Sequence, residues 1–288
     1  MSVLSSHTQS LLDLLASITH NFNSDNAVMF FSDYGDVLQY VCVLYIVLIL
    51  LGPRAMEGRE ACELSGVIRV WNLLLAVFSI AGSAYCVTLL VYMSASRPFY
   101  NVVCRFDYSV LYDGAFSFWV FSFMVSKIPE MLDTVFLCLR KKPITFLHAY
   151  HHLTVTIFSW NGGRHLLPSG IWFATMNYVV HSFMYSYYFL CSCGLKRVVA
   201  PIAPLITGLQ IAQMVFGYAI CLYTAYHKFV SPYGCETPAQ LIRMGLLMYG
   251  SYFFLFVGFF ISRYGKEKSR RPRKTSAETA IVERRPIT

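Results

Sequence analysis

The chain has 288 residues, of which 56% are hydrophobic and only 13% are charged. A soluble domain carries about 25% charged residues and 45–50% apolar ones. The composition therefore excludes a soluble enzyme, a disordered chain and a disulfide-stapled secreted module. It predicts a multi-pass membrane protein with a single membrane domain.

Seven stretches of the chain are apolar and close to the length of about 20 residues that a membrane-crossing helix needs. They cover residues 34–52, 67–92, 116–138, 144–160, 170–190, 199–225 and 239–262. The expected fold class is therefore all-α and integral to the membrane, with seven transmembrane helices. Residues 1–33 form the expected N-terminal segment, residues 34–265 the membrane domain, and residues 266–288 a basic tail.

The positive charges indicate how these helices are oriented. Residues 263–288 carry nine Lys and Arg residues against three Glu, directly after a hydrophobic stretch, which favours a membrane-flanking cytosolic tail over a nucleic-acid-binding segment. If the C-terminus is cytosolic, sixteen Lys and Arg residues lie on the cytosolic side and four on the opposite side. This asymmetry agrees with the positive-inside rule and predicts a lumenal or extracellular N-terminus.

The third stretch contains three ionisable residues, Lys127, Glu130 and Asp133, on one side of the expected helix. Each charge at mid-membrane costs about 2.5–3.5 kcal/mol on insertion scales. An internally neutralised pair that joins helices is one interpretation. A polar cavity lining is the interpretation that three ionisable groups on one face favour.

The fourth stretch contains His148, His151 and His152, whose spacing of i, i+3 and i+4 places three imidazoles on one helix face. The fifth and sixth stretches add further polar residues at helical spacing: Asn177, His181, Tyr185, Tyr188, Gln210 and Gln213. Hydrogen bonding between helices is an equally good interpretation of the two glutamines. The histidines themselves are predicted to meet at one point.

Clustered histidines suggest either a metal or acid–base and nucleophilic chemistry. A di-iron centre needs more imidazole ligands than the four at membrane depth, although a single metal with histidine and carboxylate ligands remains possible. We expect no metal, and imidazoles that act as nucleophile or general base. The neighbouring run Arg140, Lys141 and Lys142 suits a multiply phosphorylated ligand such as a coenzyme A thioester, or it serves membrane topology alone.

Four motifs then give a resemblance to a known family. Residues 127–134 fit the pattern KxxExxDT, residues 148–152 fit HxxHH, residues 177–188 fit NYxVHxxMYxYY, and residues 207–213 fit TxxQxxQ. In this order and spacing they resemble the very-long-chain fatty acid elongase family, the membrane 3-ketoacyl-CoA synthases. The resemblance covers residues 34–265.

The resemblance implies that six of seven helices enclose an acyl-chain tunnel in the endoplasmic reticulum membrane. It implies condensation of an acyl-CoA with malonyl-CoA, with loss of CO2, for fatty acid biosynthesis. His151 would be acylated and His148, His152 and His181 would assist, or the histidines would act only as bases. Lys127, Glu130 and Asp133 would tune the imidazoles. The neutral donors and pocket-lining residues would be Asn177, Tyr185, Tyr188, Gln210 and Gln213.

No bound cofactor and no nucleic acid is expected. The implied partners are the ketoacyl reductase, dehydratase and enoyl reductase of the elongation cycle, and a homodimer is possible. Pro143 stands where family members acting on polyunsaturated chains usually carry Gln, which favours saturated or monounsaturated long chains. The alternative is a channel or transporter that uses the intramembrane charges as an ion path, against which the ordered motifs argue.

Two of the nine cysteines, Cys104 and Cys235, fall in expected lumenal loops, one after the second span and the other before the seventh. The endoplasmic reticulum lumen permits disulfides. If spans two to seven close a ring, the two loops meet across its seam, and we predict a bridge there. Two unpaired thiols in mobile loops are the alternative.

Overall fold

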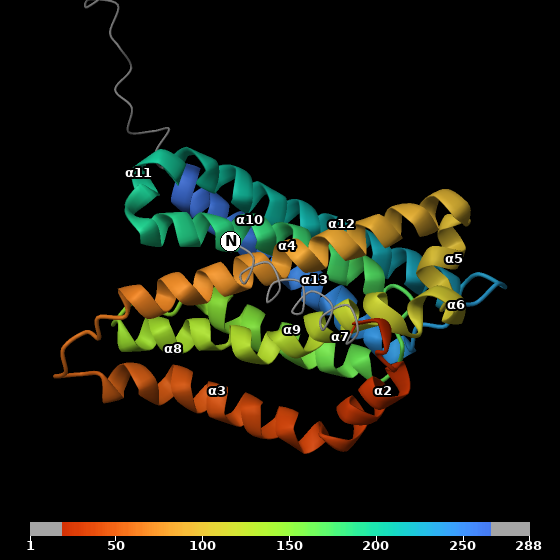
Figure 1. The fold of residues 1–288 in the computed structure, drawn as a ribbon, viewed down its shortest axis with the longest axis horizontal. Helices are drawn as coiled ribbons and strands as arrows, with labels where there is room; N and C mark the ends of the chain where they lie inside the picture. Colours follow the sequence, from red (N-terminus) through yellow and green to blue (C-terminus); the bar gives the residue numbers. More distant parts are fainter. Residues whose placement is uncertain (1–18, 266–288) are drawn as a thin grey trace, which may run out of the picture.

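A computed structural model describes residues 19–265, and this part of the chain is helical and contains no β-strand (Figure 1). The predicted basic tail at 266–288 lies outside the described residues. The helices are α2 (Ser24–Asp33), α3 (Gly35–Ala55), α4 (Ser65–Ser96), α5 (Phe99–Cys104), α6 (Tyr108–Leu111), α7 (Gly114–Glu130), α8 (Leu132–Leu139), α9 (Phe146–Gly163), α10 (Gly170–Leu190), α11 (Lys196–Val199), α12 (Ala203–Phe229) and α13 (Ala239–Phe260).

Four helical runs within residues 19–265 are long and apolar enough to cross a membrane. They cover Gly35–Ala55, Ser65–Ser96, Gly170–Phe229 and Ala239–Gly265. The third run contains both α10 and α12, which pack against each other. An all-α membrane protein is therefore confirmed. The count of seven spans stays a prediction, although every predicted stretch coincides with a helix or, at 116–138, with two.

The predicted third span is divided between α7 and α8 at Met131. Pro129 lies in the last turn of α7 and has no N–H to donate. The Met131 N–H bonds instead to the carbonyl of Ile128, three residues back. This tightened turn ends α7 between Glu130 and Asp133, the two acidic residues predicted to share one helix face.

Helix contacts close a ring in the order α4, α7, α9, α13, α12, α10 and back to α4. Small residues allow close approach at two contacts: a Cβ on Gly82 would lie 2.5 Å from Tyr178, and one on Gly217 would lie 2.3 Å from Tyr249. Helix α3 lies outside this ring and packs against α8 and α9. The ring has two ends, which we call the Arg140 end, where α8 and α11 lie, and the disulfide end, where α2, α5 and α6 lie (Figure 1).

Helix α2 is an unpredicted element within the expected N-terminal segment. The Asn23 side chain caps it by accepting a hydrogen bond from the Asn26 N–H. Its other end is anchored where Trp160 and Arg164 donate to the carbonyl of Phe31 at 2.9 and 2.8 Å. Helix α2 thereby packs against α7 and α9 and covers part of the disulfide end.

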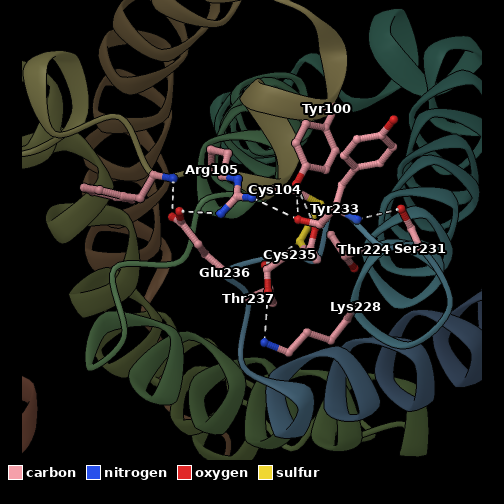
Figure 2. The surroundings of a disulfide bond; sticks show 12 residues. Tyr100, Cys104, Arg105, Thr224, Lys228, Ser231, Tyr233, Cys235, Glu236 and Thr237 are labelled. Atoms are coloured by element: carbon pink, nitrogen blue, oxygen red, sulfur yellow. Dashed lines mark hydrogen bonds and ion pairs between the residues drawn. A yellow bond between two sulfur atoms is a disulfide. The ribbon is translucent and has the colours of Figure 1, made fainter.

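The predicted Cys104–Cys235 disulfide is present at this end (Figure 2). The two cysteines do not meet because their spans are neighbours, as we expected: the ring places α10 and α12 between α4 and α13. Helix α5 extends from the end of α4 to α12 and carries Cys104 to the loop before α13. The Glu236 N–H donates to the Cys104 carbonyl at 3.0 Å.

Polar contacts surround the bridge. Tyr100 donates to the carbonyls of Tyr233 and Gly234 at 2.9 and 2.8 Å, and Arg105 donates to Glu236 at 3.2 Å (Figure 2). The hydrogen bond to Glu236 raises the pKa of Arg105 above its ordinary value, so the Arg105 guanidinium stays charged. The bridge therefore adds a covalent bond to a contact that already has hydrogen bonds.

Candidate active site

A cavity of about 730 Å³ lies inside the ring and extends to the Arg140 end; we call it the polar cavity because histidine, carboxylate and amide side chains share its wall with apolar ones. It receives side chains from α4, α8, α9, α10, α12 and α13. Eleven of the predicted site residues line it: Asp133, Arg140, His148, His151, His152, Asn177, His181, Tyr185, Tyr188, Gln210 and Gln213. Residues from four separate motifs are thus brought to one cavity.

A second, apolar cavity of about 90 Å³ extends toward the disulfide end. Its walls are mainly aromatic and aliphatic, and α2 contributes Ser24, Ala27, Val28 and Phe31. Four residues line both cavities: His151, Asn177, Gln213 and Met214. The polar and the apolar cavity therefore meet beside His151.

The three histidines of α9 lie at one face but in different surroundings. The ring centroids of His148 and His152 are 4.4 Å apart, and those of His151 and His152 are 5.4 Å apart. The His151 ring packs on Tyr252 at 5.1 Å, and no hydrogen bond joins its nitrogens to any described side chain. This leaves a ring nitrogen of His151 available to a ligand.

His148 is held by a chain of hydroxyl groups. Its Nε2 lies 2.8 Å from Thr134 Oγ1, and Thr134 Oγ1 lies 2.8 Å from the hydroxyl of Tyr45 on α3. Thr145 caps α9 by accepting from the His148 N–H. The His148 ring is therefore fixed from both α8 and α3.

Lys127 and Glu130 form a fully buried ion pair, 2.7 Å from Lys127 Nζ to Glu130 Oε1, behind the cavity wall. Lys127 also donates to Asn177 Oδ1 at 2.9 Å, and Asn177 Nδ2 lies 3.1 Å from His181 Nε2. Glu130 Oε2 lies 3.8 Å from His181 Nδ1. Two predicted motifs therefore join in one buried network around His181.

Asp133 does not join this network. It accepts hydrogen bonds from Trp71 Nε1 at 2.7 Å and from the Tyr185 hydroxyl at 3.0 Å. All three residues of the motif nevertheless face α10. Lys127 contacts Asn177, Glu130 contacts His181 and Asp133 contacts Tyr185, and these partners follow one another at helical spacing. Asp133 therefore joins α8 to α4 and α10.

The basic run is only partly at the cavity. Arg140 lines the polar cavity. The Lys141 ammonium group instead donates a hydrogen bond to the Arg59 carbonyl at 3.1 Å, and Lys142 is exposed.

The two glutamines of the fourth motif lie at the cavities. Gln210 donates a hydrogen bond to the Met184 sulfur at 3.5 Å, and Gln213 lines both cavities. The two glutamines thus point into the ring interior.

Sequence reasoning missed several residues of the site. These residues contact the predicted ones but do not lie on a polar helix face that the sequence would reveal. They are Trp71, which bonds to Asp133, Thr134, which bonds to His148, Tyr45, which bonds to Thr134, and Tyr252, which packs on His151. Thr134 ends the first motif and was the one available signal. Among residues 19–265, no group of three His, Cys, Asp or Glu side chains is arranged to hold a metal ion.

The fold and the site define an all-helical membrane protein with a histidine-lined cavity inside a ring of helices. The family model described as ELO, the GNS1/SUR4 family, matches residues 30–272. The chain is 52% identical over 272 residues to "Very long chain fatty acid elongase 4" of Trypanosoma cruzi, with 94% of each chain covered. It is 39% identical over 251 residues to "Very long chain fatty acid elongase 6" of Drosophila melanogaster, covering 84% of this chain and 78% of that one.

A further relative, "Fatty acid elongase 3" of Trypanosoma cruzi, is 42% identical over 267 residues, covering 85% of this chain and 89% of the relative. The chain belongs to the ELO family and is an enzyme of fatty acid elongation. The predicted resemblance is confirmed, and the channel or transporter alternative is not supported.

Proposed function

We propose that the protein condenses a long-chain acyl-CoA with malonyl-CoA to give a 3-ketoacyl-CoA, CO2 and free CoA. The observation that carries the proposal is the position of His151, which lies where the polar cavity meets the apolar one. An acyl thioester needs both environments, because its tail is apolar and its nucleotide head is charged. The reacting carbonyl belongs at their junction.

The first half-reaction forms an acyl-imidazole. An unprotonated ring nitrogen of His151 attacks the thioester carbonyl, the C–S bond breaks, and CoA leaves as the thiolate. The acylated ring then gives up its remaining N–H proton, which protonates the thiolate and leaves a neutral acyl-imidazole. Malonyl-CoA then enters the polar cavity and loses CO2 to form a thioester enolate. The enolate carbon attacks the acyl carbonyl, the C–N bond breaks, and the departing imidazolate takes up a proton from water, which restores neutral His151.

The other site residues assist these steps. His148, held by Thr134, and His152 lie beside His151 on α9 and orient it or exchange protons with it. Asn177, Gln210 and Gln213 are neutral donors for the enolate and the developing oxyanion, with Tyr185 and Tyr188 on the same wall. In the base-only alternative, the histidines remove protons and no acyl-enzyme forms.

The enzyme assignment can be tested directly. Purified protein with a long-chain acyl-CoA and labelled malonyl-CoA should yield a labelled 3-ketoacyl-CoA and CO2. Ion flux through proteoliposomes without this product would contradict the proposal. The same assay across acyl chains tests our expectation of saturated and monounsaturated substrates.

The wider proposal places this enzyme in the endoplasmic reticulum membrane with seven spans, a lumenal N-terminus and a cytosolic C-terminus. Its catalytic domain spans residues 34–265. The product would pass to a ketoacyl reductase, a dehydratase and an enoyl reductase, and a homodimer is possible. The charge asymmetry of the sequence supports this orientation.

Enlarging Val28 should shorten the longest product. Val28 on α2 lines the apolar cavity, which has only about 90 Å³ and must widen by side-chain rotation when a chain enters. We expect Val28→Phe to remove at least the last elongation step while shorter acyl-CoAs are still extended, as measured by product chain length.

The matched control is Met29→Phe, because Met29 is the next residue on α2 and is 57% exposed. It should leave the product distribution unchanged. Unaltered chain lengths in an active Val28→Phe enzyme would show that the acyl tail does not reach α2.

Neutralising Arg140 should weaken CoA binding. Arg140 lines the polar cavity, and a hydrogen bond to a charged group contributes about 1.5–3 kcal/mol. We therefore expect Arg140→Gln to raise KM for acyl-CoA by at least about tenfold, more than it lowers kcat. Lys142→Gln is the control, since Lys142 is exposed and lies outside the cavity wall. If Arg140→Gln has normal kinetics but the protein inserts poorly or in the opposite orientation, the basic run serves membrane topology and not CoA binding.

A further inference from the structure

The buried network around His181 determines which way the Asn177 amide faces. Lys127 is 2% exposed, and its ammonium group can only donate. It lies 2.9 Å from Asn177 Oδ1, so that oxygen accepts from Lys127. The amide nitrogen of Asn177 therefore faces Nε2 of His181, at 3.1 Å.

This orientation in turn selects one form of His181. Asn177 Nδ2 donates, so His181 Nε2 accepts and carries no proton. The ring proton of neutral His181 is then on Nδ1, which faces Glu130 Oε2 at 3.8 Å. Glu130 Oε2 is buried and has no hydrogen-bond partner among the described residues, so it is free to receive this N–H.

Asn177 has a second amide hydrogen that the network does not use. Its side chain lines both cavities, at the junction where His151 also lies. His181 has one nitrogen facing Asn177 and the other facing Glu130. Of these polar groups, Asn177 is the one left with a donor for a reacting carbonyl oxygen.

We propose, resting on the condensation mechanism above, that Asn177 is a catalytic oxyanion donor for acyl transfer at His151. Lys127 is the positioning residue that turns its N–H groups toward the cavity. His181 is a second positioning residue, held as the neutral Nδ1–H tautomer, and is not the nucleophile. No bond to His181 or Lys127 forms or breaks in this assignment.

The tautomer can be measured without any turnover. Protein labelled with ¹³C and ¹⁵N in histidine gives ring carbon shifts that distinguish the Nδ1–H from the Nε2–H form, and His181→Gln identifies the signal. We expect the Nδ1–H form in the wild-type protein. A wild-type His181 in the Nε2–H form would overturn the assignment, whatever the enzyme's activity.

Lys127 is tested by removing both charges together, because a lone buried carboxylate would destabilise the fold. In Lys127→Met/Glu130→Gln the Asn177 amide is free to turn over, and we expect the Nε2–H form of His181 to appear. Retention of the Nδ1–H form alone would show that Lys127 does not set the orientation.

The donor role is tested with Asn177→Asp, which keeps the shape and removes both N–H groups. Loss of one oxyanion donor lowers rate by about 10²–10³-fold. We expect CoA release from acyl-CoA alone to slow by about 100-fold with unchanged acyl-CoA Kd. Asn161→Asp is the matched control, since Asn161 on α9 donates to the Ile157 carbonyl and lines neither cavity.

An unchanged rate in Asn177→Asp would overturn the donor role. If wild-type protein releases no CoA at all from acyl-CoA, the covalent mechanism fails instead. The His181 tautomer measurement distinguishes these cases, because it depends on the network alone.

Discussion

Replacing His151 with alanine should lower the condensation rate by at least about 10³-fold, the scale on which loss of a nucleophile acts. The fold should survive, because the hydrogen bond that joins His151 to α13 uses its backbone: Tyr252 donates to the His151 carbonyl at 3.1 Å, and only the ring packing on Tyr252 and Phe256 is lost. No described side chain depends on a hydrogen bond from the His151 ring. The loss should therefore be chemical, with thermal stability close to wild type.

The mechanism is separated from the base-only alternative by incubating the wild-type protein with acyl-CoA alone. A burst of free CoA and an acyl mass adduct on the peptide containing His151 are expected, and both should vanish in His151→Ala. His165→Ala is the control, since His165 is exposed at the end of α9. Condensation without any adduct or burst would contradict the acyl-imidazole.

Removing the Cys104–Cys235 bridge should cost up to about 4–5 kcal/mol of folding free energy, because it closes a loop of 131 residues that the unfolded chain would otherwise leave open. Cys104→Ala/Cys235→Ala should therefore unfold at a lower temperature in detergent. Reduction of the wild-type protein should give the same direction of change.

Two exposed free cysteines provide the control. Cys62→Ala/Cys193→Ala should leave the unfolding temperature unchanged, because neither thiol is bonded. Non-reducing peptide mapping should recover a Cys104–Cys235 crosslinked peptide. Alkylation of both thiols in unreduced protein would contradict the bridge and the proposed lumenal side of both loops.

Hydropathy predicted where the helices lie because membrane spans are long and their apolar character is local. The predicted stretch 170–190 coincides with α10, and 239–262 differs from α13 by two residues. The histidine face of α9 was also readable, since residues at i, i+3 and i+4 share a side of any helix. Such inferences need only one helix at a time.

Most contacts between two helices could not be predicted from the sequence, although the Cys104–Cys235 bridge was. Asp133 was predicted to share a helix side with Glu130, but nothing in that spacing indicated that its partners would be Trp71 on α4 and Tyr185 on α10. The contact between Lys127 and Asn177 joins residues 50 positions apart, and no spacing rule predicts it. The order of helices around the ring could not be predicted either, because the apolar face of one helix can pack against several different helices.

The hydroxyl chain from Tyr45 through Thr134 to His148 has a practical consequence for shortened forms of the protein. Helix α3 lies outside the ring, so its deletion would remove none of the helices that enclose the cavity. It would, however, leave Thr134 without the Tyr45 hydroxyl, and Thr134 is the partner of the His148 ring. A form of the protein without α3 would therefore keep the cavity walls and lose the alignment of the His148 imidazole, so Tyr45→Phe should reproduce its catalytic defect in the full chain.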